Sequence, residues 1–136
     1  MNKKTKVALT LKSSINGQTA QYLYMARYAA DGDIHRLWYS DIQGDDVTEN
    51  IIHFEKDHMV INRHGAFKGS MRFEPGKETE FEYTALMTTG RLRILTTDYS
   101  LEEEENKVYL KVSYLIRDDS GAADIECSQE FSFSTL

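Results

Sequence analysis

The chain has a single cysteine, Cys127, and it lacks any run of about 20 apolar residues. One thiol cannot form an internal disulfide or a cysteine-rich metal site, and its apolar surroundings favour inert packing over reactivity. The absence of a long apolar run excludes a membrane-spanning helix. No apolar stretch follows the basic first residues, so we expect no secretory signal. Together these absences predict a cytoplasmic protein with no membrane partner.

Motifs for cofactors and metals are also missing. The sequence contains no glycine-rich loop of the kind that cradles a phosphate group. The four histidines, His35, His53, His58 and His64, have no recognised ligand spacing with a third ligand nearby. We therefore expect neither a metal site nor a cofactor, and no catalytic residue can be assigned from a motif.

Positive charge is scarce, because 16 lysines and arginines stand against 22 acidic residues and the net charge is −6. This balance argues against nucleic acid as a partner, since such binding depends on neutralising phosphates. Residues 1–30 are the exception: they hold five basic residues and no acid, whereas residues 31–136 hold 11 basic and 22 acidic residues. The basic segment is either an arm for an acidic partner or a strand whose charges are offset by an acidic neighbour. We expect the second arrangement.

What the sequence does contain is a series of turn signals, spaced roughly 9 to 16 residues apart, as is typical of all-β sandwiches and barrels. Between the turns, apolar and polar residues alternate as they do in strands with one buried face. In residues 107–117, for example, Val108, Leu110 and Val112 share one face. The turn signals are Asn16-Gly17, Asp31-Gly32-Asp33, Gly44-Asp45-Asp46, Glu55-Lys56-Asp57, His64-Gly65, Pro75-Gly76, Thr89-Gly90, Glu105-Asn106 and Asp118-Asp119-Ser120-Gly121.

The proline–glycine turn also fixes a register between the segments on either side of it. Their apolar residues share one face only if the loop has an odd number of residues. A three-residue loop, 75–77, sets Gly69 opposite Tyr83, so that the aromatic ring lies over the glycine. The same register sets Arg72 opposite Glu80, which predicts a favourable outward ion pair.

These segments together predict a fold. Short loops between antiparallel neighbours favour a meander, and closing the meander removes its exposed edges. We therefore predict one all-β domain over residues 1–136, a single antiparallel up-and-down barrel of about 8–10 strands. An open two-sheet sandwich is the alternative.

Five short motifs occur in order in the stretch from Tyr39 to Tyr114, and the first of them begins two residues earlier, at Leu37. They are Leu37-Trp38-Tyr39-Ser40-Asp41, Arg63-His64-Gly65, Met71-Arg72-Phe73, Phe81-Glu82-Tyr83-Thr84 and Gly90-Arg91-Leu92. This order resembles the YwiB-like family of small, uncharacterised bacterial proteins, which are placed with the lipocalin-like, or calycin-like, β-barrels. The resemblance implies a barrel instead of a sandwich, and it implies no catalytic residues because the family has no established activity. One departure is Asp41, where such proteins usually have glutamate.

A small barrel is either filled by side chains or open enough for one ligand. Alternation places four polar residues on the inward face, namely Tyr39, Asp41, Arg63 and Gln129, above an apolar cup of Phe81, Tyr83, Phe131 and Phe133. Arg63 would anchor a carboxylate or phosphate in a bidentate fork. The alternative is an internal pair in which Asp41 and Arg63 satisfy one another, because buried charges must be paired.

Three functions are compatible with these residues. We favour non-enzymatic binding of a small amphipathic or anionic molecule inside the barrel. The alternative is an interaction module with a filled core, which would form a homodimer or hold a partner through apolar outer faces near Tyr22, Tyr24 and Trp38. A small hydrolase or isomerase would need an inward carboxylate base, either Asp41 or Asp98.

Overall fold

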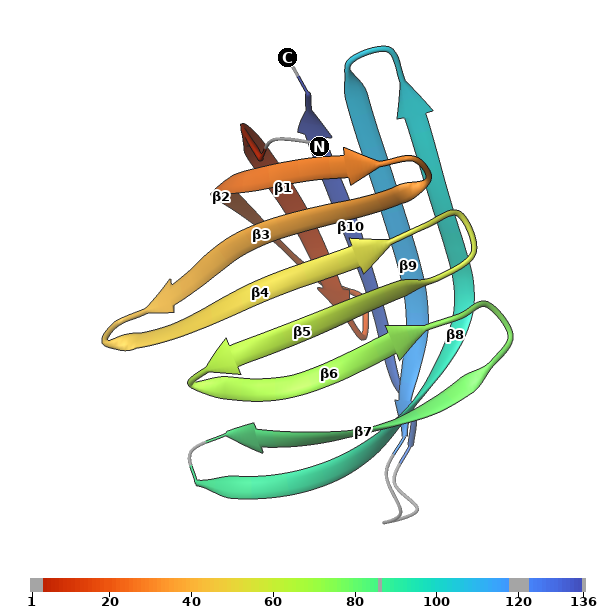
Figure 1. Ribbon diagram of the computed structural model, residues 1–136. Helices are drawn as coiled ribbons and strands as arrows, with labels where there is room; N and C mark the ends of the chain where they lie inside the picture. Colours follow the sequence, from red (N-terminus) through yellow and green to blue (C-terminus); the bar gives the residue numbers. More distant parts are fainter. Residues whose placement is uncertain (1–3, 86, 118–122, 136) are drawn as a thin grey trace.

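Ten antiparallel strands close into a barrel in the computed structural model of the protein (Figure 1). The structure describes residues 4–85, 87–117 and 123–135. Each strand pairs with the next along the chain, and the first strand pairs with the last, so the predicted up-and-down barrel is confirmed. The strands are β1 (Thr5–Ile15), β2 (Gln18–Asp31), β3 (Ile34–Gln43), β4 (Asp46–Phe54), β5 (Met59–Gly65), β6 (Phe67–Phe73), β7 (Glu78–Ala85), β8 (Thr88–Glu104), β9 (Lys107–Arg117) and β10 (Ile125–Ser134).

The barrel interior is built from the alternating apolar residues. On β9, Val108, Leu110 and Val112 are buried, and on neighbouring β10 Phe131 and Phe133 are buried beside them. Burying such side chains supplies the main favourable free energy of folding, about 25 cal/mol per Å² of apolar surface. Within the described ranges, no helix is long and apolar enough to cross a membrane.

One predicted turn is wrong. Thr89-Gly90 lies inside β8, and the chain reverses earlier, at Met87, which has a φ of 64°. Gly90 leaves room for Tyr83, because a Cβ at this position would collide with the Cζ and hydroxyl end of that side chain. The Tyr83 ring therefore lies over Gly90, and not over Gly69 as we predicted. The Asp118–Gly121 turn signal lies outside the described residues.

The predicted register across the proline–glycine turn is correct, because Gly69 pairs with Tyr83. The predicted ion pair is wrong, since Arg72 contacts Glu74, with its Nη2 2.5 Å from Oε1, instead of Glu80. Paired positions of β6 and β7 extend only over residues 67–69 and 83–85. Beyond these positions the ladder is not continued, although the Thr79 hydroxyl of β7 still donates to the Arg72 carbonyl at 2.7 Å.

A β-bulge in β8 changes which side chains point inward. The register with β9 shifts between Thr96 and Asp98, so one extra residue reverses the alternation beyond it. Asp98 is consequently exposed, and its predicted inward position is wrong. Tyr99 points inward instead, and its hydroxyl donates to the carbonyl oxygens of Glu55 and of His58, the latter at 2.9 Å.

β2 pairs with β3 over only part of its length. β2 pairs with β1 over residues 18–28, but it pairs with β3 only over residues 27–31. Figure 1 shows β2 following β1 at the back of the barrel and then turning to the front, where it joins β3. Residues 18–26 of β2 and 39–43 of β3 therefore diverge and leave an opening, which we call the β2–β3 seam.

The apolar outer face that we expected near Tyr22 and Tyr24 is present on β2, but the residues beside them form it. The side chains of Tyr22 and Tyr24 line a pocket inside the barrel, so they do not form an apolar outer face. Leu23 and Met25 point outward in their place and are 75% and 72% exposed. Trp38 on β3 is half-buried.

The basic segment is only partly offset by an acidic neighbour. Lys12 lies opposite Glu130 of β10, as the expected arrangement requires. Lys6, however, lies opposite Arg27 of β2, so basic residues face each other across these strands. The expectation of an acidic neighbour is therefore wrong for the first half of β1.

Candidate functional site

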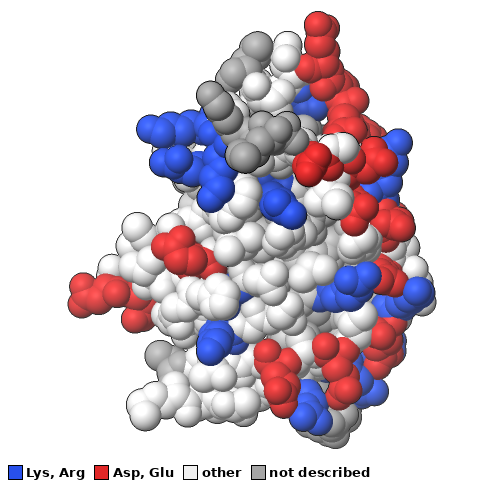
Figure 2. Space-filling model, viewed as in Figure 1, with Lys and Arg blue, Asp and Glu red and all other residues white. Residues whose placement is uncertain are grey.

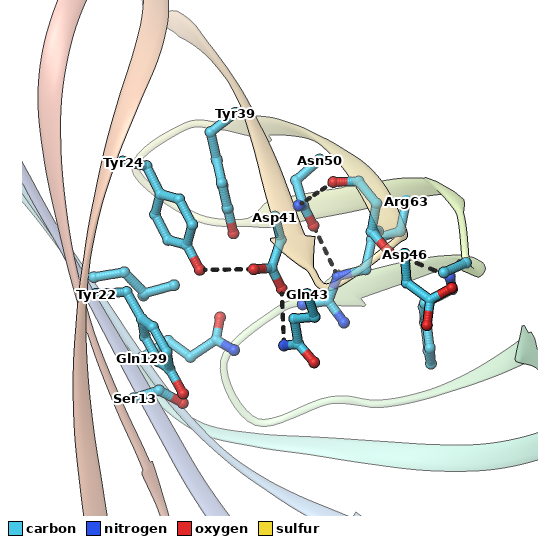
Figure 3. Close-up of a pocket in the computed structure, with 14 residues that line it drawn as sticks. Ser13, Tyr22, Tyr24, Tyr39, Asp41, Gln43, Asp46, Asn50, Arg63 and Gln129 are labelled. Carbon is cyan, nitrogen blue, oxygen red and sulfur yellow. Dashed lines mark hydrogen bonds between the residues drawn. The ribbon is translucent and has the colours of Figure 1, made fainter.

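A pocket of about 430 Å³ lies at the end of the barrel where the turns between β1 and β2, β3 and β4, and β5 and β6 meet (Figure 3). The β2–β3 seam opens into it. Its lining combines aromatic rings, amides, two carboxylates and one guanidinium group. The lining residues are Leu11, Ser13, Tyr22, Tyr24, Tyr39, Asp41, Gln43, Asp46, Thr48, Asn50, Arg63, Ala66, Phe67 and Gln129.

The pairing of β3, β4 and β5 places Tyr39, Asn50 and Arg63 side by side in one interior row. The Nε of Arg63 donates to the Oδ1 of Asn50 at 3.1 Å, and Asn50 in turn donates from Nδ2 to the carbonyl of Thr48 at 3.3 Å. Asn50 is only 4% exposed, so it is a fixed support. The guanidinium carbon of Arg63 lies 5.4 Å from the centre of the Phe67 ring, a cation–π contact. The arginine head is therefore held in place at the pocket wall.

Asp41 is not the partner of Arg63. It lies two residues beyond Tyr39 on β3, and β4 separates it from β5, so two strand spacings of about 4.8 Å divide the two side chains. Asp41 instead accepts hydrogen bonds from the hydroxyl of Tyr24 at 3.3 Å and from Gln43 at 3.5 Å. In the part of the chain that the structure describes, no carboxylate lies within 4.0 Å of the Arg63 guanidinium. The internal Asp41–Arg63 pair that we considered is therefore not formed.

Two tyrosines close the β2–β3 seam from either side, with ring centres 4.8 Å apart (Tyr24 and Tyr39). Burial raises the pKa of Tyr39 to about 12, an effect that Arg63 opposes and Asp41 reinforces. Burial, followed by the Asp41 carboxylate, also raises the pKa of Tyr24. Both phenols are consequently protonated near neutral pH and serve as hydrogen-bond donors.

The opposite wall of the pocket contributes an amide from β10. Figure 3 shows the side chain of Gln129 directed into the pocket, across from the row that contains Arg63. The Oε1 of Gln129 is buried and has no hydrogen-bond partner among the described residues. Leaving such an acceptor unsatisfied costs about 1–3 kcal/mol.

Of the six residues proposed from the sequence as a ligand site, the structure brings four together at the pocket: Tyr39, Asp41, Arg63 and Gln129. The other two lie elsewhere. Phe81 is buried in the hydrophobic core. Tyr83 is stacked 5.6 Å from Phe67, behind the pocket wall.

Sequence reasoning missed Tyr24, Asn50 and Phe67. A signal for Asn50 was present, because it alternates with Ile52 and Phe54 and so shares their inward face. Tyr24 alternates with the buried Ala26 in the same way. What the sequence did not indicate is which face of β2 and β4 points inward.

A second polar cluster lies at the β8–β9 side of the barrel. The buried His35 contacts the Tyr28 hydroxyl through Nδ1 at 2.6 Å and Glu103 through Nε2 at 2.6 Å, and its ring stacks 4.7 Å from that of Phe54. Burial lowers the pKa of His35, although Glu103 opposes the effect. The cluster joins β2, β3 and β8, so its geometry is that of a structural link.

Neither metal nor thiol chemistry finds a site in the described ranges. These residues contain no group of three or more histidine, cysteine, aspartate or glutamate side chains that could hold a metal ion. Cys127 is buried, and burial raises the pKa of its thiol, which disfavours the reactive thiolate.

The fold and the pocket define a class of protein: a small, closed meander barrel with one polar, aromatic pocket at its end. The sequence matches the model of a domain of unknown function, DUF1934, over residues 6–125, so the chain belongs to that family. The crystal structure of the YwiB protein from Bacillus subtilis superposes with a TM-score of 0.86 and 18% sequence identity, covering 98% of this chain and 94% of that one. At this identity the likeness concerns the fold alone. The resemblance noted from the sequence motifs is thereby confirmed, and no curated protein matches the chain.

Proposed function

We propose that this protein binds a small amphipathic anion in the pocket at the end of the barrel and does not transform it. One observation carries the proposal. The Arg63 guanidinium is fixed by the buried Asn50 at the wall of a cavity of about 430 Å³, and no carboxylate of the described residues neutralises it there. A partly buried charge is costly unless it is paired, so an anion from outside is its natural partner.

The remaining lining suits such a ligand. A carboxylate or phosphate would accept two parallel hydrogen bonds from Arg63 and a further bond from the protonated Tyr39. The apolar part of the molecule would rest on Leu11 and Phe67. The cavity lies within the range of roughly 300–1,000 Å³ that is usual for small-molecule sites. In this use the barrel would be lipocalin-like, with a filled core below and a ligand cup above.

Asp41 and Asp46 restrict the choice of ligand. Both carboxylates line the pocket together with Arg63, so the site holds two acidic groups and one basic group. A molecule with several negative charges would be repelled by the aspartates. A ligand with one anionic group for Arg63, and hydroxyl or amine donors for the two aspartates, matches this arrangement of charge.

Two measurements test the proposal. Native mass spectrometry of the freshly purified protein shows directly whether a small molecule is retained. Thermal unfolding with octanoate, phenyl phosphate, 3-phenylpropionate or inorganic phosphate then measures stabilisation, which reaches about 2.7 kcal/mol when the probe is at 100 times its Kd. We expect at least one amphipathic probe to raise the midpoint more than inorganic phosphate does.

The matched variants are Arg63→Leu and Arg72→Leu, because Arg72 is an arginine on the outside of the barrel that pairs with Glu74. Arg63→Leu should abolish both the retained mass and the probe-induced shift while the protein still folds, whereas Arg72→Leu should preserve them. No retained mass in the wild type, together with equal probe shifts in the wild type and in Arg63→Leu, would refute the proposal.

A further inference from the structure

The outer surface of the barrel carries a basic face over β1, β2 and β3, formed by Lys4, Lys6, Arg27 and Arg36. Lys6 lies directly opposite Arg27, and Arg27 lies directly opposite Trp38. The ammonium group of Lys4 is 4.2 Å from the centre of the Trp38 ring. All four basic side chains are exposed. These side chains point away from the barrel interior, which Arg63 faces, because outward and inward residues alternate along each strand.

The charges of the basic face are not neutralised within the molecule. Across the described ranges, none of these four side chains has an acidic group within 4.0 Å. Like charges directly opposite each other destabilise a sheet. Burial and then Arg36 lower the pKa of the neighbouring His53, a further sign of positive potential here. Figure 2 shows a group of blue side chains at the upper left of the molecule, with red side chains at the top, the right edge, the left tip and the lower part.

An apolar strip adjoins these charges. Leu23 and Met25 continue along the same outer face of β2 and are 75% and 72% exposed, and Trp38 is half-buried beside Arg27. A nucleic acid would pair with the positive charges but would not cover the apolar strip. Its phosphate backbone would also extend beyond the four basic residues onto a protein with a net charge of −6. A polypeptide brings acidic and apolar side chains together.

We propose that the basic face binds a short acidic segment of another protein, which presents aspartate or glutamate and apolar side chains together on one side. The acidic side chains pair with Lys6, Arg27 and Arg36. The apolar side chains cover Leu23, Met25 and the ring of Trp38. The partner thereby relieves the repulsion between Lys6 and Arg27, and this relief adds to the affinity.

Selection from a displayed library of random twelve-residue peptides on the wild-type protein tests the proposal. The recovered peptides should be enriched in acidic and apolar residues, and raising the salt concentration should weaken their binding. Fluorescence anisotropy of the labelled peptides should show at least tenfold weaker binding to Lys6→Glu/Arg27→Glu. The matched control, Lys56→Glu/Lys68→Glu, has the same change in net charge on exposed residues elsewhere and should bind normally, as should Arg63→Leu.

Several results would overturn the proposal. Recovered peptides without acidic enrichment, or acidic peptides that bind both double variants equally, would show that the basic face is not the site. A dT12 oligonucleotide that binds more tightly than every recovered peptide, with the same dependence on Lys6 and Arg27, would assign the face to nucleic acid. If Lys6→Glu/Arg27→Glu fails to fold, Lys6→Gln/Arg27→Gln is measured instead, and unchanged binding by that variant counts against the proposal.

Discussion

Replacing Arg63 and Asn50 together by leucine should leave the unliganded protein at least as stable as the wild type, although each single replacement should destabilise it. In Arg63→Leu the Oδ1 of Asn50 loses its hydrogen-bond donor, the Arg63 Nε at 3.1 Å. Asn50 is only 4% exposed, so water does not replace that donor. In Asn50→Leu the guanidinium loses its acceptor. A buried polar group left unsatisfied costs about 1–3 kcal/mol, and a charged one costs more.

The double variant removes both unsatisfied groups at once, together with a charge that has no carboxylate partner. Replacing both members of a hydrogen-bonded pair by apolar groups is often neutral or stabilising. The two replacements should therefore be non-additive, with a coupling of about 1–3 kcal/mol in favour of the double variant. This outcome is expected if Arg63 is retained for its ligand, because residues kept for function commonly reduce stability.

The measurement is urea unfolding, monitored through the fluorescence of Trp38, the only tryptophan in the sequence. The free energy of unfolding is extrapolated to water. The protein must first be freed of any retained molecule. Additivity of the two single effects within about 0.5 kcal/mol, or a double variant less stable than either single one, would refute this reasoning. The Arg63–Asn50 pair would then be part of what holds the barrel together.

Three further predictions concern stability. The free energy of unfolding should fall as the pH drops from about 8 to about 5.5. Burial lowers the pKa of His35, so the unfolded chain takes up a proton that the folded chain excludes. His35→Gln should flatten this pH dependence, and an unchanged pH dependence contradicts the assignment to His35. Thr96→Val should raise the free energy of unfolding by about 1 kcal/mol, because the buried Thr96 hydroxyl has no partner among the described residues; a loss in urea unfolding would reveal a hidden hydrogen bond. Gly90→Ala should lower the melting temperature, since the new Cβ displaces the Tyr83 ring; adding Tyr83→Ala should abolish this penalty, and a penalty that persists would place the strain in the backbone.

The fold was largely predictable because alternation and turns are local properties of the sequence. Parity around the proline–glycine turn sufficed to place Gly69 opposite Tyr83. Where one residue breaks the parity, the same reasoning fails. The bulge before Asp98 has no glycine or proline to announce it, and it turned an expected inward carboxylate into an exposed one.

The site was less predictable, because it depends on which residues share a row across three strands. Alternation correctly placed Tyr39 and Arg63 at the pocket, but it contains no information about the stagger between β3, β4 and β5. That stagger puts Asn50 between them and moves Asp41 one row away. A neutral amide therefore supports Arg63 where charge alone suggested an ion pair.

The β2–β3 seam has a consequence for how the protein behaves at high concentration. Residues 18–26 form an edge that lacks a strand neighbour on the β3 side, and they contain no charged residue and no proline. Natural sheets protect their edges from intermolecular pairing with such residues, so this segment is where aggregation into cross-β assemblies would begin. A ligand in the pocket that Tyr24 and Tyr39 line would contact both sides of the seam and hold the edge closed. Occupancy of the pocket would then protect the protein from precipitation as well as from unfolding.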